Sequence, residues 1–314
     1  VREFVRPKYA CRKCEMGVTI AALPFRPIEK GRPGPGLLAQ VYLSKYGDHL
    51  PLYRQEQIYK RSGVTISKST MVGWGRNGYE LLMPIYEEMH KEILTSYCIQ
   101  SDDTYVPVLV DEKKKITHRG FIWAYIGNES DQVVFAYTEH RNRDGPKTFL
   151  SGYRGYLQAD AYAGYNDCFG PGGMTEVGCW AHARRYFFEA QTTEPGLSKE
   201  MLERIGALYG VEKEAKELEL SPADRCILRR EKSAPLLTGI KEWLNVQKSR
   251  VLPKSPIGQA IEYALNQWQA LNRYLEDGRL SIDNNACERA IRAVAIGRKN
   301  WMFAGSHEGA KRAA

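Results

Sequence analysis

The stretch Tyr97-Cys-Ile-Gln-Ser-Asp-Asp-Thr-Tyr-Val-Pro-Val-Leu-Val110 decides the fold. Its aromatic and β-branched residues predict a strand, and two neighbouring carboxylates, Asp102 and Asp103, lie inside it. Two further segments rich in Phe, Ile, Trp, Tyr and Val predict strands over His118–Ile126 and Gln132–Thr138. These three consecutive strands predict a meander within one sheet.

Helices and strands alternate after the meander. We expect a helix over Asp144–Tyr153, a strand over Tyr156–Asp160, a helix after Tyr165, a strand over Thr175–Trp180 and a helix over Ala181–Ala190. The order βββαβαβα predicts an α/β fold with a mixed five-stranded sheet and helices on both sides, which is the ribonuclease-H-like order. Its first and fourth strands are neighbours at the sheet centre, so Asp102 and Asp160 should meet.

The segment before the sheet, residues 37–94, predicts helices. Leu52–Arg61 forms one, Ser62–Ile66 forms a turn, and Ser67 caps a second helix that begins at Lys68. This pattern favours a helix-turn-helix, although a plain helical hairpin gives the same pattern. Gly73 and Gly75 weaken the second helix by about 1 kcal/mol each relative to Ala. That helix would present four side chains to DNA: Lys68, Ser69, Thr70 and Arg76.

These patterns divide the chain into five segments. They are a partial zinc-knuckle half with a basic Pro/Gly linker over 1–36, a helix-turn-helix-like DNA-binding region over 37–94, the first part of the α/β core over 95–190, an all-α insertion over 191–280, and the end of the core over 281–314. Within the insertion, apolar residues such as Ile261, Leu265 and Trp268 recur at helical spacing and predict core positions.

The segment Ser281-Ile-Asp-Asn-Asn-Ala-Cys-Glu-Arg-Ala-Ile-Arg292 predicts a helix, expected over Asp283–Val294, with Asp283 or Asn284 as its cap. Taken alone, Glu288 pairs with an arginine on an exposed helix, or it binds a metal or a phosphate. The two strand-borne aspartates favour the second interpretation, which requires the insertion to fold back and bring Glu288 to the sheet edge that holds them. One face of the helix would carry four polar residues: Asn285, Glu288, Arg289 and Arg292.

Asp102, Asp160 and Glu288 share one chemistry. Buried carboxylates that crowd together repel, and a divalent cation relieves the repulsion. Their hard oxygens suit Mg²⁺ or Mn²⁺, and two such ions about 3.5–4 Å apart stabilise the attacking and leaving oxygens of phosphoryl transfer. The net charge of +8 and the pI near 9.0 favour a polyanionic partner. We therefore expect two metal ions and a nucleic-acid backbone at this site.

Other polar residues lie on the helices that flank the acids. His182 and Arg185 share one face of the helix after the fifth strand, where they would orient a phosphate or a carboxylate; a structural histidine is the alternative. Asn285 would lie next to the acids and help to position them without binding the metal itself. Four basic residues would contact DNA phosphates, or else form a solvated face: Arg289, Arg292, Arg298 and Lys299.

Cys11-Arg-Lys-Cys14 has the spacing of two Zn²⁺ ligands. It is either half of a zinc site whose other half lies upstream of Val1, or a chance pair. Residues 1–32 carry eight Lys or Arg against three Glu, and residues 24–36 predict a Pro/Gly-rich linker. The seven cysteines are otherwise scattered, which suits a reducing cytoplasm. No signal peptide and no apolar run of about eighteen residues occur, and we expect a fragment cut at both ends.

Over essentially its whole length the chain resembles the insertion-sequence-66 family of bacterial DDE transposases. The resemblance rests on Arg6-Pro-Lys-Tyr-Ala-Cys-Arg-Lys-Cys14, His49-Leu-Pro-Leu-Tyr-Arg-Gln-Glu-Gln57, Asp102-Asp-Thr104, Gln158-Ala-Asp-Ala-Tyr-Ala-Gly-Tyr165, Cys179-Trp-Ala-His-Ala-Arg-Arg185, Ile282-Asp-Asn-Asn-Ala-Cys-Glu-Arg-Ala290 and Gly297-Arg-Lys-Asn-Trp301. It implies Asp102, Asp160 and Glu288 as the catalytic triad, with Asp102 rather than Asp103 as the first acid. Tyr105 and Cys287 depart from the family's usual residues, but neither departure removes a carboxylate.

This resemblance implies metal-dependent DNA cleavage and strand transfer of an insertion sequence, with two Mg²⁺ or Mn²⁺ ions. It also implies a homo-oligomer on transposon ends and target DNA, accessory transposition proteins, no membrane, and a place at the bacterial nucleoid in the cytoplasm. Two alternatives stay open: a truncated DNA-binding remnant that no longer recombines DNA, and a ribonuclease-H-like nuclease with another substrate. Zinc would require the upstream half-site.

Overall fold

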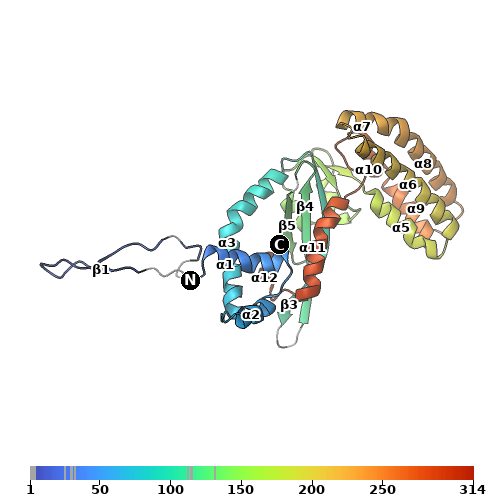
Figure 1. Cartoon of the computed structure of the whole chain (residues 1–314). Coiled ribbons are helices and arrows are strands. Elements are labelled where there is room, and N and C mark those ends of the chain that lie inside the picture. The colour runs from blue at the N-terminus through green and yellow to red at the C-terminus, as the bar shows by residue number, and fades with distance from the viewer. Residues whose placement is uncertain are drawn as a thin grey trace.

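A computed structural model describes residues 5–24, 26–28, 31, 33–111, 113, 116–130 and 132–314. Its centre is a five-stranded sheet in the order β5-β4-β3-β6-β7 (Figure 1). The strands are β3 (Cys98–Asp111), β4 (Ile116–Gly127), β5 (Val133–Thr138), β6 (Tyr156–Gln158) and β7 (Thr175–Val177). The first three form antiparallel pairs, whereas β3 with β6 and β6 with β7 are parallel. The predicted mixed five-stranded sheet is confirmed, including the adjacency of its first and fourth strands.

The elements after the meander are shorter than the sequence predicts. The helix α4 covers Asp144–Phe149, and a 3₁₀-helix, η2, covers Ala163–Cys168. Strand β6 ends at Gln158 instead of reaching Asp160. The reason is local, because the Asp160 carboxylate accepts the main-chain N–H of Tyr162 at 3.2 Å and so stabilises a turn.

The two faces of β3 contact different parts of the molecule, because successive side chains of a strand point to opposite sides. Val106 and Val108 pack with Val294 of the long helix α11 (Asn285–Trp301). On the other face, Ile99 lies in a core with Phe149 of α4. Even-numbered residues of this part of β3 therefore face α11, and odd-numbered residues face α4 and η2.

A helical region precedes the sheet: α1 (Pro35–Tyr42), the π-helix η1 (Leu43–Gly47), α2 (Leu52–Arg61) and α3 (Lys68–Ile93). The predicted bounds of α2, the start of α3 and the cap are confirmed, since Ser67 Oγ accepts the Thr70 N–H at 3.2 Å. Gly73 and Gly75 do not interrupt α3, which is 26 residues long. Tertiary packing outweighs their low helix propensity, because α3 lies against α1 and the sheet. The linker prediction over 24–36 ends slightly too late, since α1 begins at Pro35.

The N-terminal part is a two-stranded arm that projects from the rest of the molecule (Figure 1). Strands β1 (Lys8–Tyr9) and β2 (Thr19–Ile20) are antiparallel. Cys11 and Cys14 lie in the turn between them, and both are exposed free thiols. Of the sequence predictions for the basic N-terminal segment, those on Arg2, Lys30 and Arg32 fall outside the described residues.

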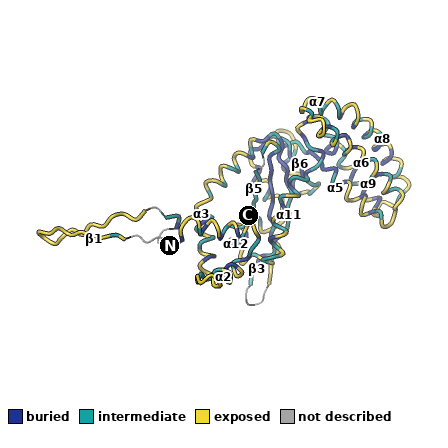
Figure 2. The backbone as a smooth tube through the Cα atoms, viewed as in Figure 1, coloured by how far each residue is buried: buried dark blue, intermediate teal, exposed yellow. Residues whose placement is uncertain are grey.

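The predicted insertion is a helical bundle whose helices alternate between buried and exposed segments (Figure 2), and its buried core continues to Cys98 of β3 and Val177 of β7. Helix α5 (Trp180–Glu189) packs into this core, through Trp180 and Phe187. The other elements are η3 (Ala190–Thr192), α6 (Pro195–Glu217), α7 (Pro222–Leu228), the π-helix η4 (Arg229–Ser233), α8 (Ala234–Lys248), α9 (Pro256–Asn266), α10 (Trp268–Asn272) and η5 (Arg273–Leu275). None of the helices in the described ranges combines the length and apolar character that a membrane crossing requires.

The chain then returns to the sheet through α11, and ends in α12 (His307–Lys311). Two expectations about α11 are corrected. It lies across the face of β3 and β4 rather than at a sheet edge, with Cys287 and Ile291 packed against Ala124. It also runs beyond the expected end at Val294, as far as Trp301, and stops where Met302 takes a φ of 62°.

Candidate active site

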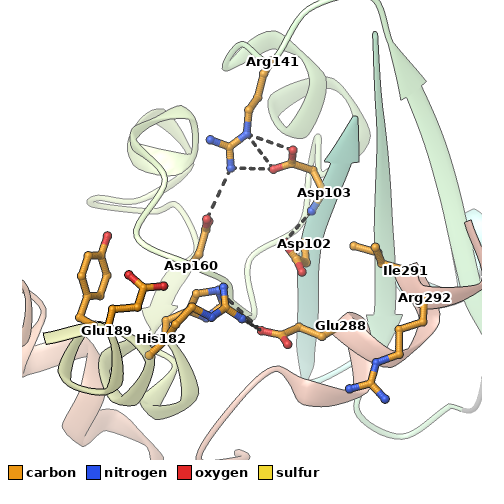
Figure 3. A pocket seen from close by; sticks show the side chains of 11 residues that line it. Asp102, Asp103, Arg141, Asp160, His182, Glu189, Glu288, Ile291 and Arg292 are labelled. Atoms are coloured by element: carbon orange, nitrogen blue, oxygen red, sulfur yellow. Dashed lines mark hydrogen bonds and ion pairs between the residues drawn. The ribbon is translucent and has the colours of Figure 1, made fainter. Parts of the chain in front are cut away.

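The three predicted acids line one cleft of about 550 Å³ (Figure 3). Asp102 comes from β3, Asp160 from the turn after β6, and Glu288 from the first turn of α11. The full lining is Asp102, Asp103, Arg141, Asp160, His182, Arg185, Tyr186, Glu189, Glu288, Ile291 and Arg292. The sequence therefore predicts correctly that three distant segments bring these carboxylates to one place.

The strand register explains how two of the acids meet. Gln100 of β3 is paired with Gln158 of β6 in parallel register. Extending this register by two residues sets Asp160 beside Asp102, and β6 ends before that point. On its β6 side, strand β3 thus has no neighbouring strand at the level of Asp102, and the cleft opens there.

Asp102 faces α11, since its partner across the β3–β4 ladder is Ala124, which packs on Cys287 and Ile291. Burial raises the pKa of the Asp102 carboxyl to about 7, and the charges of Asp160, Asp103 and Glu288 add to the rise. A hydrogen bond from the Asp103 N–H to Asp102 Oδ1, at 2.8 Å, acts in the opposite direction. No Lys or Arg among the described residues forms an ion pair with Asp102. Asp102 is therefore a buried carboxyl to which the described part of the chain offers no counter-charge.

This raised pKa predicts a pH dependence of stability in metal-free protein. Between about pH 4 and pH 7 the folded state keeps a proton on Asp102 that the unfolded chain has released. The free energy of unfolding should therefore fall as pH rises through this window. Asp102→Asn should flatten that slope in urea titrations with a chelator present. An unchanged slope in the variant would contradict the burial of this carboxyl.

Asp103 points to the opposite face of β3 and meets Arg141, in the loop after β5. Arg141 Nε lies 2.9 Å from Asp103 Oδ1 and 3.0 Å from Oδ2, while its terminal nitrogen also reaches Asp160 Oδ2 at 3.5 Å (Figure 3). Sequence reasoning missed Arg141. It follows a strand within a run of polar residues, His140-Arg-Asn-Arg143, and nothing in that run distinguishes it from Arg143.

Glu288 is held by the two residues predicted to lie near the acids. Arg185 approaches Glu288 Oε1 at 3.3 Å and His182 Nε2 approaches the same oxygen at 3.7 Å. Burial lowers the pKa of His182, although the Asp160 charge opposes the shift. Within the described part of the chain its Nδ1 has no hydrogen-bond partner.

Asn285 and Asp283 form a cap at the start of α11. Asp283 Oδ1 accepts the Asn285 N–H at 3.1 Å, and the Asn285 side-chain amide donates to Asp283 Oδ2 at 2.7 Å. Tyr209 of α6 donates to the same Oδ2 at 2.8 Å. Of the two caps that the sequence allowed, Asp283 accepts this N–H, whereas the Asn284 side chain makes no cap bond in the described chain and donates to the Ser101 main-chain oxygen at 3.2 Å. Asn285 thus orients the helix, and it is absent from the described cleft lining.

The predicted DNA-contacting residues divide into two groups. Arg292 borders the cleft, and Arg289 and Lys299 are exposed on α11. Arg298 instead ties α11 to β3, because it donates to Thr104 Oγ1 at 3.1 Å and to the Tyr105 carbonyl, with its guanidinium 3.9 Å from the Tyr105 ring. On α3, all four of the predicted contact residues are exposed: Lys68, Ser69, Thr70 and Arg76.

The donor set suits a divalent cation, although two of the three acids, Asp160 and Glu288, are paired with basic side chains here. Among the described residues, no group of three His, Cys, Asp or Glu side chains is arranged to hold a metal ion. Asp102, however, is a buried acid near three other carboxylates. A hard divalent cation is the usual relief for such crowding. Asp102, Asp160 and Glu288 would hold it, once Asp160 and Glu288 exchange their basic partners for the ion.

A protein-family model and several curated proteins match most of the chain. A family model described as transposase IS66 family matches residues 30–312. Among curated proteins of Sinorhizobium fredii (strain NBRC 101917 / NGR234), the chain is 37% identical to the uncharacterized protein y4qI, over 98% of this chain and 59% of that protein. It is 32% identical to the uncharacterized protein y4hP, over 100% of this chain and 60% of that protein. The chain thus spans about 60% of the length of these relatives. It belongs to the IS66 transposase family.

Proposed function

We propose that this chain carries the catalytic core of a transposase, and that the acidic cleft cuts insertion-sequence ends and joins them to target DNA. The strand order β5-β4-β3-β6-β7, with a helical insertion before α11, supports a ribonuclease-H-like core. The observation that carries the proposal is the meeting of Asp102, Asp160 and Glu288 in one cleft from segments far apart in sequence.

The roles of the residues follow from their positions. Asp102 on β3 and Asp160 in the turn just after β6 would hold one Mg²⁺ or Mn²⁺ together, and Glu288 would complete the site of a second. When bound, two such ions supply Lewis-acid stabilisation of phosphoryl transfer. Arg292 borders the cleft and would hold a DNA phosphate, a contact that positions the backbone without reading sequence.

A second DNA contact would come from the α2–α3 hairpin. Lys68, Ser69 and Thr70 form the exposed first turn of α3, where the Lys68 ammonium and the two hydroxyl groups would contact phosphate oxygens. Arg76 lies two turns further along and pairs loosely with Glu80 at 3.7 Å, an exposed pair that costs little to exchange for DNA. We propose that this surface of the α2–α3 hairpin binds DNA as a helix-turn-helix.

Tyr186 adds a prediction about unpaired bases. Its ring lines the cleft, is 40% exposed and stacks on Tyr263 with centroids 4.5 Å apart. An aromatic ring held in this way suits base stacking, which contributes about 1–3 kcal/mol per base. Tyr186→Ala should therefore weaken binding of a short oligothymidine by roughly five- to a hundredfold in fluorescence anisotropy at fixed salt.

Phe188 provides the control for Tyr186. It lies on the same helix and is 55% exposed, but it is absent from the described cleft lining. Phe188→Ala should bind the oligonucleotide like wild type, and Tyr186→Phe should retain most of the affinity. Equal losses for Tyr186→Ala and Phe188→Ala would contradict a stacking site in the cleft.

Two alternatives give different outcomes in one assay. The 314-residue chain is incubated with labelled insertion-sequence ends and Mn²⁺. Nicked and joined products support the transposase. A gel shift without products supports a DNA-binding remnant, and cleavage without preference for the ends supports a nuclease with another substrate. In this proposal zinc at Cys11 and Cys14 is a separate matter, since these two exposed thiols supply only two of the four ligands that a structural site needs.

A further inference from the structure

Arg141 is the basic residue most closely engaged with the acids of the cleft, and the proposed metal set gives it no role. Its guanidinium makes a forked contact with Asp103, with nitrogen–oxygen distances of 2.8, 2.9 and 3.0 Å. It also lies 3.8 Å from the centre of the Tyr162 ring. The Tyr162 hydroxyl donates to the Arg141 main-chain oxygen at 2.6 Å. Three kinds of contact thus fix both the loop and the side chain.

The contacts of Arg141 with its two acids are unequal. The Asp103 side chain is 6% exposed and accepts the fork at normal hydrogen-bond distances. The Asp160 side chain is 25% exposed, and its contact with Arg141 is longer, at 3.5 Å. Asp103 lies on the face of β3 away from Asp102, so it can hold Arg141 permanently. Asp160 is the acid that Arg141 can release.

We propose that Arg141 is a built-in counter-ion that occupies the cation position at Asp160, and that a divalent ion must displace it there to bind. This inference rests on the proposed function and concerns the regulation of the same site. Without a metal, the acids of the cleft repel one another, and a guanidinium relieves this because it stays protonated at every physiological pH. Once displaced, Arg141 stays bound to Asp103.

The proposal explains why the described carboxylates share a cleft without forming a metal-binding group. A metal ion at Asp160 would compete with Arg141 for Oδ2, because two cations at one carboxylate repel each other. Arg141 therefore lowers the affinity of the cleft for metal and protects the fold while metal is absent. Coupling between two ligands of one site changes affinity by roughly five- to a hundredfold.

The test measures Mn²⁺ binding to the full chain by isothermal titration calorimetry without DNA, so DNA chemistry does not enter the readout. Arg141→Gln should bind Mn²⁺ roughly five- to a hundredfold more tightly than wild type. In chelator, the melting temperature of this variant should be lower than that of wild type. Added Mn²⁺ should raise the melting temperature of the variant by more than it raises that of wild type. Arg143→Gln is the matched control, because Arg143 lies in the same loop and pairs with Asp167 at 3.0 Å on the exposed surface. Its Mn²⁺ affinity should equal that of wild type.

Other results for these variants would overturn the counter-ion proposal or the metal site on which it rests. Arg141→Gln with equal or weaker Mn²⁺ affinity overturns the counter-ion proposal. If Arg141→Gln does not fold, Arg141→Lys carries the test, since an ammonium cannot fork across both carboxylates and Mn²⁺ affinity should still rise, by less. Unchanged or weaker affinity in Arg141→Lys then overturns it. Asp160→Asn tests the metal site separately from the counter-ion role of Arg141. If this variant binds Mn²⁺ as tightly as wild type, Asp160 is not a metal ligand and the proposed metal site is wrong.

Discussion

Asp102→Asn is expected to reduce cleavage of insertion-sequence ends by about a thousandfold or more, whereas the neighbouring Asp103→Asn should cost less than about tenfold. The two carboxyls are adjacent in sequence but lie on opposite faces of β3. Asp102 shares its face with Ala124 and α11, which carries Glu288. Asp103 is bound instead to Arg141. Single-turnover cleavage with Mn²⁺ measures both rates.

A DNA gel shift provides the control for this pair of variants. Both should bind DNA like wild type, because neither carboxyl belongs to the α2–α3 surface. If Asp103→Asn proves the more damaging change, the first acid of the site is misassigned, and with it the pairing of Asp102 with Asp160 across the β3–β6 register.

Arg229→Met is expected to have the largest effect on stability, about 3–5 kcal/mol in urea unfolding. Its side chain is fully buried in the insertion and forms a two-pronged pair with Glu212, at 2.7 Å for each contact. It also donates to the main-chain oxygens of Tyr274, Asp277 and Leu280, at 2.6, 3.0 and 2.9 Å. Methionine would leave the Glu212 charge and three carbonyls without these partners.

Lys232→Ala is the control, since its pair with Glu214 is partly exposed and is worth only about 0–1 kcal/mol. Similar losses in the two variants would contradict the central role of Arg229. This role extends to the site, because Leu280 lies shortly before the cap of α11. Arg229 fixes the end of the insertion from which Glu288 returns to the sheet.

The sequence predicts the sheet well because local composition and topology agree there. Strands β3, β4 and β5 are long and rich in aromatic and β-branched residues. The crossover from β3 to β6 leaves few ways to place the next parallel strand. The α2–α3 hairpin is also predicted closely, since Ser67 is a side-chain cap that acts over three residues.

The course of α11 could not be predicted from local preference. Gly297 lies inside this helix, where propensity predicts weakness. Tertiary contacts explain it, since a Cβ at this position would lie 2.8 Å from Trp301 Nε1 and 3.3 Å from His49 Nδ1. The glycine thus permits a close approach between α11 and the segment before α2, and such contacts cannot be read from a single stretch of sequence.

Site residues could be predicted from the sequence only where a side chain differs clearly from its neighbours in the chain. A carboxylate within an apolar strand, such as Asp102, is conspicuous in the sequence. Arg141 is one arginine among many in a basic chain, and only the fold shows that its loop closes over Asp103 and Asp160. Arg298 shows the reverse error: it lies in a basic run typical of DNA contact, yet its guanidinium is engaged with Thr104 and Tyr105.

The proposed transposase chemistry requires that Asp102, Asp160 and Glu288 together hold divalent metal. Crystals of the chain soaked in Mn²⁺, measured by anomalous diffraction, test it most directly. We expect manganese within about 2.0–2.6 Å of carboxylate oxygens of Asp102 and Asp160, with Glu288 at a second ion and Arg141 withdrawn from Asp160. Manganese that binds elsewhere, or a cleft in which Asp160 keeps its contact with Arg141 at saturating Mn²⁺, would contradict it.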